Sequence, residues 1–202
     1  PTQVLLEGQI ANIGASNVTT HGFCWNTLEN PTINDSNVDL GTASTKGVFR
    51  FSATGLVPNT TYYVSAYATN SYGTSYGKVL KFTTPKTDQT ITFDVIPDAV
   101  YGQKQFDLVA SSSSGLDVVF ESTNPNVATV SGKTLTIVGA GTSTIMARQA
   151  GNDNYNEAEP QAQELTVSKA ALMIVLDDIS RIYGQINPTF TCQYLGFVNG
   201  DD

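Results

Sequence analysis

Residues 56–66 have the sequence LVPNTTYYVSA, in which a turn leads directly into an alternating segment. Proline presets the backbone φ of a turn and asparagine tolerates the left-handed conformation, so Pro58 and Asn59 favour a tight turn. From Tyr62 to Ala66, apolar or aromatic side chains recur at every second position, which places them on one face of an extended chain. The segment therefore predicts a β-strand that enters a half-buried sheet straight from a turn.

The same two-residue period recurs in other short segments. Residues 49–53, 62–69 and 134–138 read as strands, and glycine, proline, asparagine or aspartate separates such segments along the chain. No segment has the sustained 3.6-residue apolar period of an amphipathic helix. Many short strands with this punctuation are typical of sandwiches, so we predict an all-β fold of tandem immunoglobulin-like β-sandwiches.

Composition and charge exclude several classes of partner. Charged residues make up 14% of the 202 residues, and the formal net charge is −8 with a pI near 4.4. Nucleic-acid binding and docking on anionic membranes both need clustered Lys and Arg, so neither is expected. The longest apolar run, residues 170–176, is far shorter than the roughly 20 residues of a membrane span, so no membrane insertion is expected in this segment.

Charge also divides the chain near residue 86. Residues 1–85 carry four bases and four acids, whereas residues 86–202 carry six bases and fourteen acids. This shift, together with the short linker-like sequence at 85–88, predicts a boundary between two modules. Cys24 and Cys192 fall on opposite sides of that boundary, so no intrachain disulfide is expected.

The first predicted domain, residues 1–85, resembles a fibronectin type III module. The segment 56–66 looks like the E–F region of that family, in which Leu, Pro, Thr, Tyr and Val recur at every second residue. The resemblance implies a tyrosine corner, in which the ring of Tyr62 lies in the core and its hydroxyl bonds to backbone a few residues upstream. It assigns Pro58 a structural role in the turn before that strand.

The tryptophan of this module departs from the family pattern. The usual strand-B tryptophan is missing, and Trp25 stands instead in residues 21–27, HGFCWNT. That variant resembles the fibronectin-type repeats of Bacteroidetes surface proteins. Because side chains alternate along a strand, only one of Cys24 and Trp25 is expected to point into the core.

The second predicted domain, residues 86–169, resembles the bacterial immunoglobulin-like (Big/MBG-type) repeats. The resemblance rests on residues 122–130, STNPNVATV, and on residues 139–145, GAGTSTI. It assigns structural roles to Tyr101 and Gly102.

A third unit, residues 170–202, resembles the truncated start of a further MBG-type repeat. Its Tyr183-Gly184-Gln185 repeats the Tyr101-Gly102-Gln103 that stands 82 residues earlier. So short a segment cannot close a sandwich and leaves strand edges unpaired. We therefore expect residues 171–202 to gain partial order by packing on the second module or on a neighbouring chain.

Side chains that support catalysis are scarce. His21 is the only histidine, so no His-rich zinc site is predicted, and Cys24 is expected to be a small buried apolar residue and not a reactive thiol. The glycine-rich residues 138–143 precede a strand and not a helix, which argues against a dinucleotide loop. Asp177 and Asp178 would need a deep cleft to act as a glycosidase pair. We predict no catalytic residues, no metal site, no cofactor and no enzyme activity.

Two places are candidates for ligand binding. Tyr63 and Tyr67 share the strand face opposite Tyr62, where they either pack across strands or offer rings to a sugar or protein. Asp153 and Glu157 belong to the oxygen-rich sequence GNDNYNEAE, which forms either a structural loop or a cation site.

The resemblances imply spacer and adhesive modules of a bacterial cell-surface or secreted multi-domain protein. Such modules lie outside the cell, and the expected partner is a cell-surface glycan or protein, with the chain itself monomeric. The alternative is a carbohydrate-binding accessory region of a glycan-utilisation or adhesin protein, which would use exposed tyrosines or the 151–159 loop.

Overall fold

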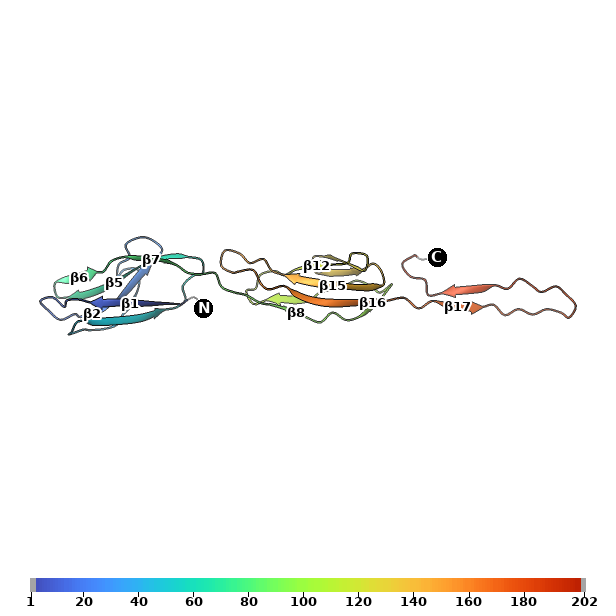
Figure 1. The fold of residues 1–202 in the computed structure, drawn as a ribbon, viewed down its shortest axis with the longest axis horizontal. Helices are drawn as coiled ribbons and strands as arrows, with labels where there is room; N and C mark the ends of the chain where they lie inside the picture. Colours follow the sequence, from blue (N-terminus) through green and yellow to red (C-terminus); the bar gives the residue numbers. More distant parts are fainter. Residues whose placement is uncertain (1–2, 201–202) are drawn as a thin grey trace. The chain divides into compact units, whose positions relative to one another are not determined.

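The computed structural model describes residues 3–200. All the regular secondary structure in that range is β-strand (Figure 1). This part of the chain contains no helix that is long and apolar enough to cross a membrane. The chain forms two compact units. The first runs to Asp88 and includes Gly151–Glu157, and the second contains Gln89–Ala150 and the residues from Ala158 onward. The all-β prediction is therefore confirmed.

The first unit is a β-sandwich of two antiparallel sheets. One sheet has two strands, β1 and β4, and the other has the order β3-β2-β5-β6, with β7 also paired to β5. The strand bounds are β1 (Val4–Ile10), β2 (Thr20–Asn26), β3 (Ser36–Asp39), β4 (Gly47–Ala53), β5 (Thr61–Asn70), β6 (Gly73–Tyr76) and β7 (Leu80–Thr83).

Aromatic and aliphatic side chains fill the space between these two sheets. The two-residue period of β5 sends Tyr62 and Val64 into this core, where they join Leu6 of β1 and Phe23 of β2. Trp25 packs against the same cluster, and its ring lies 6.1 Å from that of Phe51 between centroids. The alternation read from the sequence therefore places the core on one face of each strand.

The opposite face of β2 is also covered, although alternation alone would leave it open to solvent. Cys24 is buried there, and its thiol lies 3.4 Å from the carbonyl oxygen of Pro31. Pro31 belongs to residues 27–35, the segment that connects β2 to β3. Trp25 thus points into the sandwich core, while Cys24 is buried outside it under this connecting segment.

Asp35 holds the connecting segment against the sheet. Its carboxylate accepts hydrogen bonds from the Asn26 side chain at 2.5 Å and from the backbone N–H of Thr32 at 2.8 Å. The pKa of Asp35 is lowered, first because of the Thr32 N–H and then because of side-chain hydrogen bonds from Asn26 and Thr32. The segment that buries Cys24 is therefore fastened by a charge-assisted contact.

The second unit contains a second sandwich. Its sheets have the orders β12-β15-β16-β9, β10-β14-β13 and β11-β8, and every pairing except the parallel one between β16 and β9 is antiparallel. The strand bounds are β8 (Ile91–Phe93), β9 (Ala99–Val100), β10 (Phe106–Asp107), β11 (Ala110–Ser112), β12 (Val119–Ser122), β13 (Ala128–Ser131), β14 (Thr134–Ile137), β15 (Gly141–Arg148) and β16 (Gln161–Ser168).

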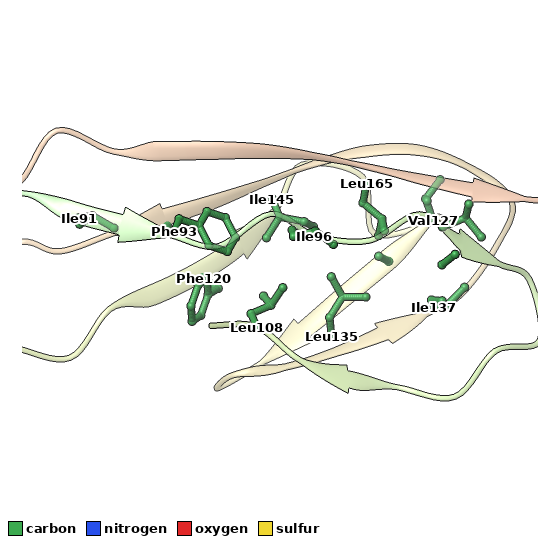
Figure 2. Close-up of a cluster of buried hydrophobic side chains, with 14 of the residues drawn as sticks. Ile91, Phe93, Ile96, Leu108, Phe120, Val127, Leu135, Ile137, Ile145 and Leu165 are labelled. Carbon is green, nitrogen blue, oxygen red and sulfur yellow. The ribbon is translucent and has the colours of Figure 1, made fainter. Parts of the chain in front are cut away.

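A separate hydrophobic core lies between these sheets (Figure 2). Leu135, Ile145 and Leu165 come from three different strands and are fully buried. At one end of the cluster, the rings of Phe93 and Phe120 lie 5.4 Å apart between centroids. Each sandwich therefore has its own core, which is the physical requirement for a module that folds on its own.

The chain continues into a two-stranded antiparallel hairpin, β17 (Met173–Leu176) with β18 (Cys192–Leu195). All four residues of β17 are exposed, although all four are apolar. An isolated hairpin is marginally stable in water, because it buries little apolar surface. Within the second unit, Val198 lies against Gly102, so the residues after the hairpin contact the Tyr101–Gly102 turn.

Candidate functional site

Tyr62 makes the contact that a tyrosine corner requires. Its ring is buried in the first core and stacks on Phe82, with 5.8 Å between centroids. Its hydroxyl accepts a hydrogen bond of 3.1 Å from the backbone N–H of Val57, five residues upstream. The turn between them contains Asn59 at φ 47, the left-handed conformation that asparagine tolerates. Pro58 lies in this turn, and its carbonyl accepts the hydroxyl of Thr60.

Thr84 is a structural residue that the sequence patterns did not single out. It is buried, and its hydroxyl donates to the carbonyl of Val57 at 2.6 Å and accepts from the N–H of Thr60 at 2.9 Å. It thereby joins the turn before β5 to the end of β7. The sequence signal is a threonine directly before Pro85, and it is weak in a chain this rich in threonine.

The two tyrosine candidates do not form an open platform. Tyr67 is 5% exposed, and its hydroxyl donates to the carbonyl of Val38 at 3.1 Å. Tyr63 is half-buried, and the ammonium of Lys81 lies 5.7 Å from its ring centroid. Neither ring of this pair is fully open to a sugar face. Two tyrosines of this region are exposed: Tyr72, at the turn between β5 and β6, and Tyr76 at the end of β6.

Asp153 and Glu157 are exposed at the loop of residues 151–157. The Asn152 amide oxygen of that loop accepts hydrogen bonds from the N–H groups of Asn154 and Tyr155. Within residues 3–200, no group of three His, Cys, Asp or Glu side chains is placed to hold a metal ion. The loop geometry is that of an Asx turn closed on its own backbone.

The same loop is hydrogen-bonded to the linker within the first unit. The N–H of Thr87 donates to the carbonyl of Asn154 at 2.8 Å, and the N–H of Asn156 donates to the carbonyl of Thr87 at 2.9 Å. The Lys86 ammonium also donates to the carbonyl of Asn152 at 2.7 Å. These contacts place residues 151–157 with the first unit, whereas the sequence assigned them to the second domain. The domain boundaries at 85, 86 and 169 stay predictions.

The two Tyr-Gly-Gln tripeptides adopt the same turn. In the first, the N–H of Gln103 donates to the carbonyl of Val100 at 3.0 Å, and in the second, the N–H of Gln185 donates to the carbonyl of Ile182 at 3.2 Å. The central glycines, Gly102 and Gly184, have φ values of 92 and 88, as the third position of a type II turn requires. The repeat seen in the sequence is therefore a repeat of backbone geometry.

His21 and Cys24, two residues considered for metal binding or nucleophilic chemistry, are both buried on β2. His21 is buried on β2, where a ring nitrogen lies 2.8 Å from the carbonyl oxygen of Gly41 and the ring meets Phe49 edge-on. Burial raises the pKa of the Cys24 thiol, and the charge of Asp35 raises it further. A buried thiol with a raised pKa is a poor nucleophile. Cys24 and Cys192 are both free thiols.

Comparison with known proteins bears on the C-terminal residues. Residues 172–202 match the family model described as MBG domain (YGX type). The segment is similar to MBG domains. The expected resemblance of this MBG-type segment is confirmed, and Tyr183-Gly184-Gln185 lies within it.

Among solved structures, the chain is similar to the crystal structure of chicken CNTN1 FN1-FN3 domains. The identity is 10%, the TM-score is 0.35, and the match covers 96% of this chain and 81% of that chain. No curated protein matches the sequence. The evidence for the β-sandwich architecture is the pairing of strands into sheets and the hydrophobic core in each sandwich.

Proposed function

We propose that the chain is a structural array of β-sandwich modules that serves as a spacer and adhesive region. The parent would be a bacterial cell-surface or secreted multi-domain protein, with these modules outside the cell and without catalysis. The tandem sandwiches and the similarity of the C-terminal residues to MBG domains support this proposal. A spacer must also keep its fold while its two ends are pulled apart.

The parallel pairing of β9 with β16 is the observation that carries the mechanical part of this proposal. Val167 lies opposite Ala99 and Ser168 opposite Val100, and the N–H of Tyr101 donates to the carbonyl of Ser168 at 2.8 Å. β9 stands near the start of the second sandwich and β16 at its end. Pulling on the two ends therefore slides two parallel strands past each other and loads their hydrogen bonds together.

Single-molecule force spectroscopy on the full chain, pulled by its ends, tests this role. Tyr101 is the second residue of a type II turn, where proline is favoured, so Tyr101→Pro keeps the turn and deletes the N–H that binds Ser168. Tyr101→Ala is the matched control, because it removes the same ring and keeps the N–H. We expect the unfolding force of the second sandwich to fall more in the proline variant than in the alanine variant. Equal forces in the two variants would remove the support that this pairing gives.

Carbohydrate binding is the second candidate function, and the exposure of Tyr72 favours it. Its ring is 80% exposed at the β5–β6 turn, a geometry that permits stacking on a sugar face. A glycan array separates the two functions. Specific binding that Tyr72→Ala abolishes would support the carbohydrate reading, and an array without specific signals would leave the spacer reading in place.

A further inference from the structure

Thr87, in the linker, has both of its backbone polar groups bonded to the loop of residues 151–157. Its N–H donates to the carbonyl of Asn154 at 2.8 Å, and its carbonyl accepts from the N–H of Asn156 at 2.9 Å. These two bonds form an isolated parallel bridge between Thr87 and Tyr155. A residue bonded on both backbone groups is held in one extended conformation, so the linker is ordered at this point.

Side chains on either side of Thr87 add two charge-assisted contacts. The Lys86 ammonium donates to the carbonyl of Asn152 at 2.7 Å, and the Asp88 carboxylate accepts from the side-chain amide of Asn156 at 2.7 Å. All of these residues belong to the first compact unit. Contacts of charged groups on the surface are individually weak, so the two backbone bonds of Thr87 are the main attachment.

The loop that holds the linker has a shape set by its own hydrogen bonds. The Asn152 side-chain oxygen accepts from two backbone N–H groups of the loop, and the N–H of Asn152 donates to the carbonyl of Tyr155 at 3.1 Å. Gly151 precedes this turn at φ 77, and a Cβ there would overlap the carbonyl oxygen of Tyr155. The loop therefore presents its carbonyl and N–H groups to Thr87 in a fixed arrangement.

The two ends of the loop are fastened by the second sandwich. The last pair of β15 with β16 places Ala147 opposite Gln161, and the N–H of Ala158 donates to the carbonyl of Gln149 at 2.9 Å. Ala158 is buried in the second core. If β15 separated from β16, both ends of the loop would be free, and a chain segment with free ends has many more conformations to lose on ordering.

We propose that residues 151–157 are a clamp that orders linker residues 86–88 only while β15 and β16 stay paired. Opening of the second sandwich frees the ends of the clamp, and both backbone bonds of Thr87 are then lost together. The alternative is that the first sandwich orders the linker, through the 3.3 Å bond from the N–H of Asn59 to the carbonyl of Pro85. The clamp does not depend on the spacer role, because it concerns only the order of the linker.

Hydrogen exchange of the Thr87 amide, measured by nuclear magnetic resonance on the full chain, tests the clamp. Asn156→Pro deletes the N–H that the Thr87 carbonyl accepts, and the extended Tyr155 before it suits a proline. Asn156→Ala is the matched control, because it removes the side-chain amide and keeps the N–H. We expect exchange at Thr87 to be at least about fivefold faster in the proline variant than in the alanine variant. Equal rates would overturn the proposal.

A second pair of variants tests the shape of the loop without a proline. Asn152→Ala removes the oxygen that closes the turn and keeps the carbonyl that Lys86 contacts. Asp153→Ala, at the exposed neighbouring position, is its control. We expect the Thr87 amide to exchange about fivefold faster in Asn152→Ala and at the parent rate in Asp153→Ala. Parent rates in both variants would contradict the clamp.

Core variants show which sandwich the linker follows. Leu165→Ala opens a cavity in the second core and should speed exchange at Thr87 at least about tenfold, and Ile145→Val is the milder variant, with about a threefold effect. Val64→Ala, in the first core, should instead speed exchange of the Thr84 N–H, which donates to Thr60, and leave Thr87 at the parent rate.

Two results of the core variants would overturn the proposal. If exchange at Thr87 followed exchange at Thr84 in every variant, the first sandwich would order the linker. If exchange at Thr87 were unchanged in Leu165→Ala and Ile145→Val, the clamp would open without any opening of the second sandwich.

Discussion

The hydroxyl of Tyr62 accepts a hydrogen bond from the backbone N–H of Val57 at 3.1 Å, and this contact closes the turn that leads into β5. β5 pairs with β2, β6 and β7, so it is the central strand of the larger sheet of the first unit. A local contact therefore sets where the most heavily paired strand begins.

Tyr62→Phe should destabilise the first sandwich by about 1 kcal/mol, because the Val57 N–H loses its acceptor while the ring remains in the core. Trp25 is the single tryptophan and packs on that core, so urea unfolding followed by its fluorescence reports this sandwich. Tyr72→Phe removes a hydroxyl from an exposed ring and should leave the midpoint unchanged. Equal shifts in both variants would show that the hydroxyl of Tyr62 contributes nothing specific.

Leu165→Ala should lower the stability of the second sandwich by about 2–5 kcal/mol, because it opens a cavity at a fully buried site. The unfolding transition followed by Trp25 fluorescence, which reports the first sandwich, should be the same as in the parent chain. Far-ultraviolet circular dichroism should show a second transition at lower denaturant concentration than in the parent chain. Val119→Ala, at an exposed position of β12, is the control. An equal decrease in the midpoint of the fluorescence transition would mean that the two sandwiches unfold cooperatively.

The stability of the first sandwich should depend less on pH when Asp35 is changed to Asn. Because the folded-state pKa of Asp35 is lowered, chiefly by the Thr32 N–H, its contribution to stability is present above the unfolded pKa of about 3.9. That contribution is lost as the pH falls through the lower folded pKa. Asp35→Asn should therefore be less stable at neutral pH, and the difference from the parent should shrink in acid. Urea midpoints at several pH values measure this, with Glu29→Gln in the same connecting segment as the control.

The two free thiols should react at very different rates. Cys24 is buried and burial raises its pKa, so a thiol reagent at pH 8 should label it only after unfolding. Cys192 is partly exposed and should react in the folded chain. In Cys192→Ser, labelling should therefore require denaturant. Fast labelling of that variant under native conditions would show that residues 27–35 open readily from the sheet.

Gly102→Ala should cost more stability than Gly184→Ala. Both glycines have positive φ, where an L-residue costs about 1–2 kcal/mol. An added Cβ at Gly102 would also lie 2.7 Å from Val198, whereas nothing lies within 4 Å of one added at Gly184. Thermal unfolding followed by circular dichroism compares the pair. Similar losses would mean that Val198 shifts freely and does not pack firmly on the turn.

Residue periodicity determined the strands and, with them, the all-β class. The alternation around Tyr62 decides which side chains share a face, because successive side chains of a strand point to opposite sides. The Tyr-Gly-Gln turns were also set locally, since glycine is the residue that adopts positive φ without strain. These features depend on neighbours in the chain, so the sequence was sufficient to predict them.

The tertiary structure alone decided what covers each face. Tyr67 is buried and its hydroxyl reaches across β2 to the carbonyl of Val38 on β3, which removes it as an open ligand platform. The 151–157 loop is tied to the linker at Thr87, and within residues 3–200 β1 pairs only with β4. Alternation predicts which side chains share a strand face, but segments distant in sequence determine whether that face is buried. That choice depends on long-range packing, which no local pattern of residues encodes.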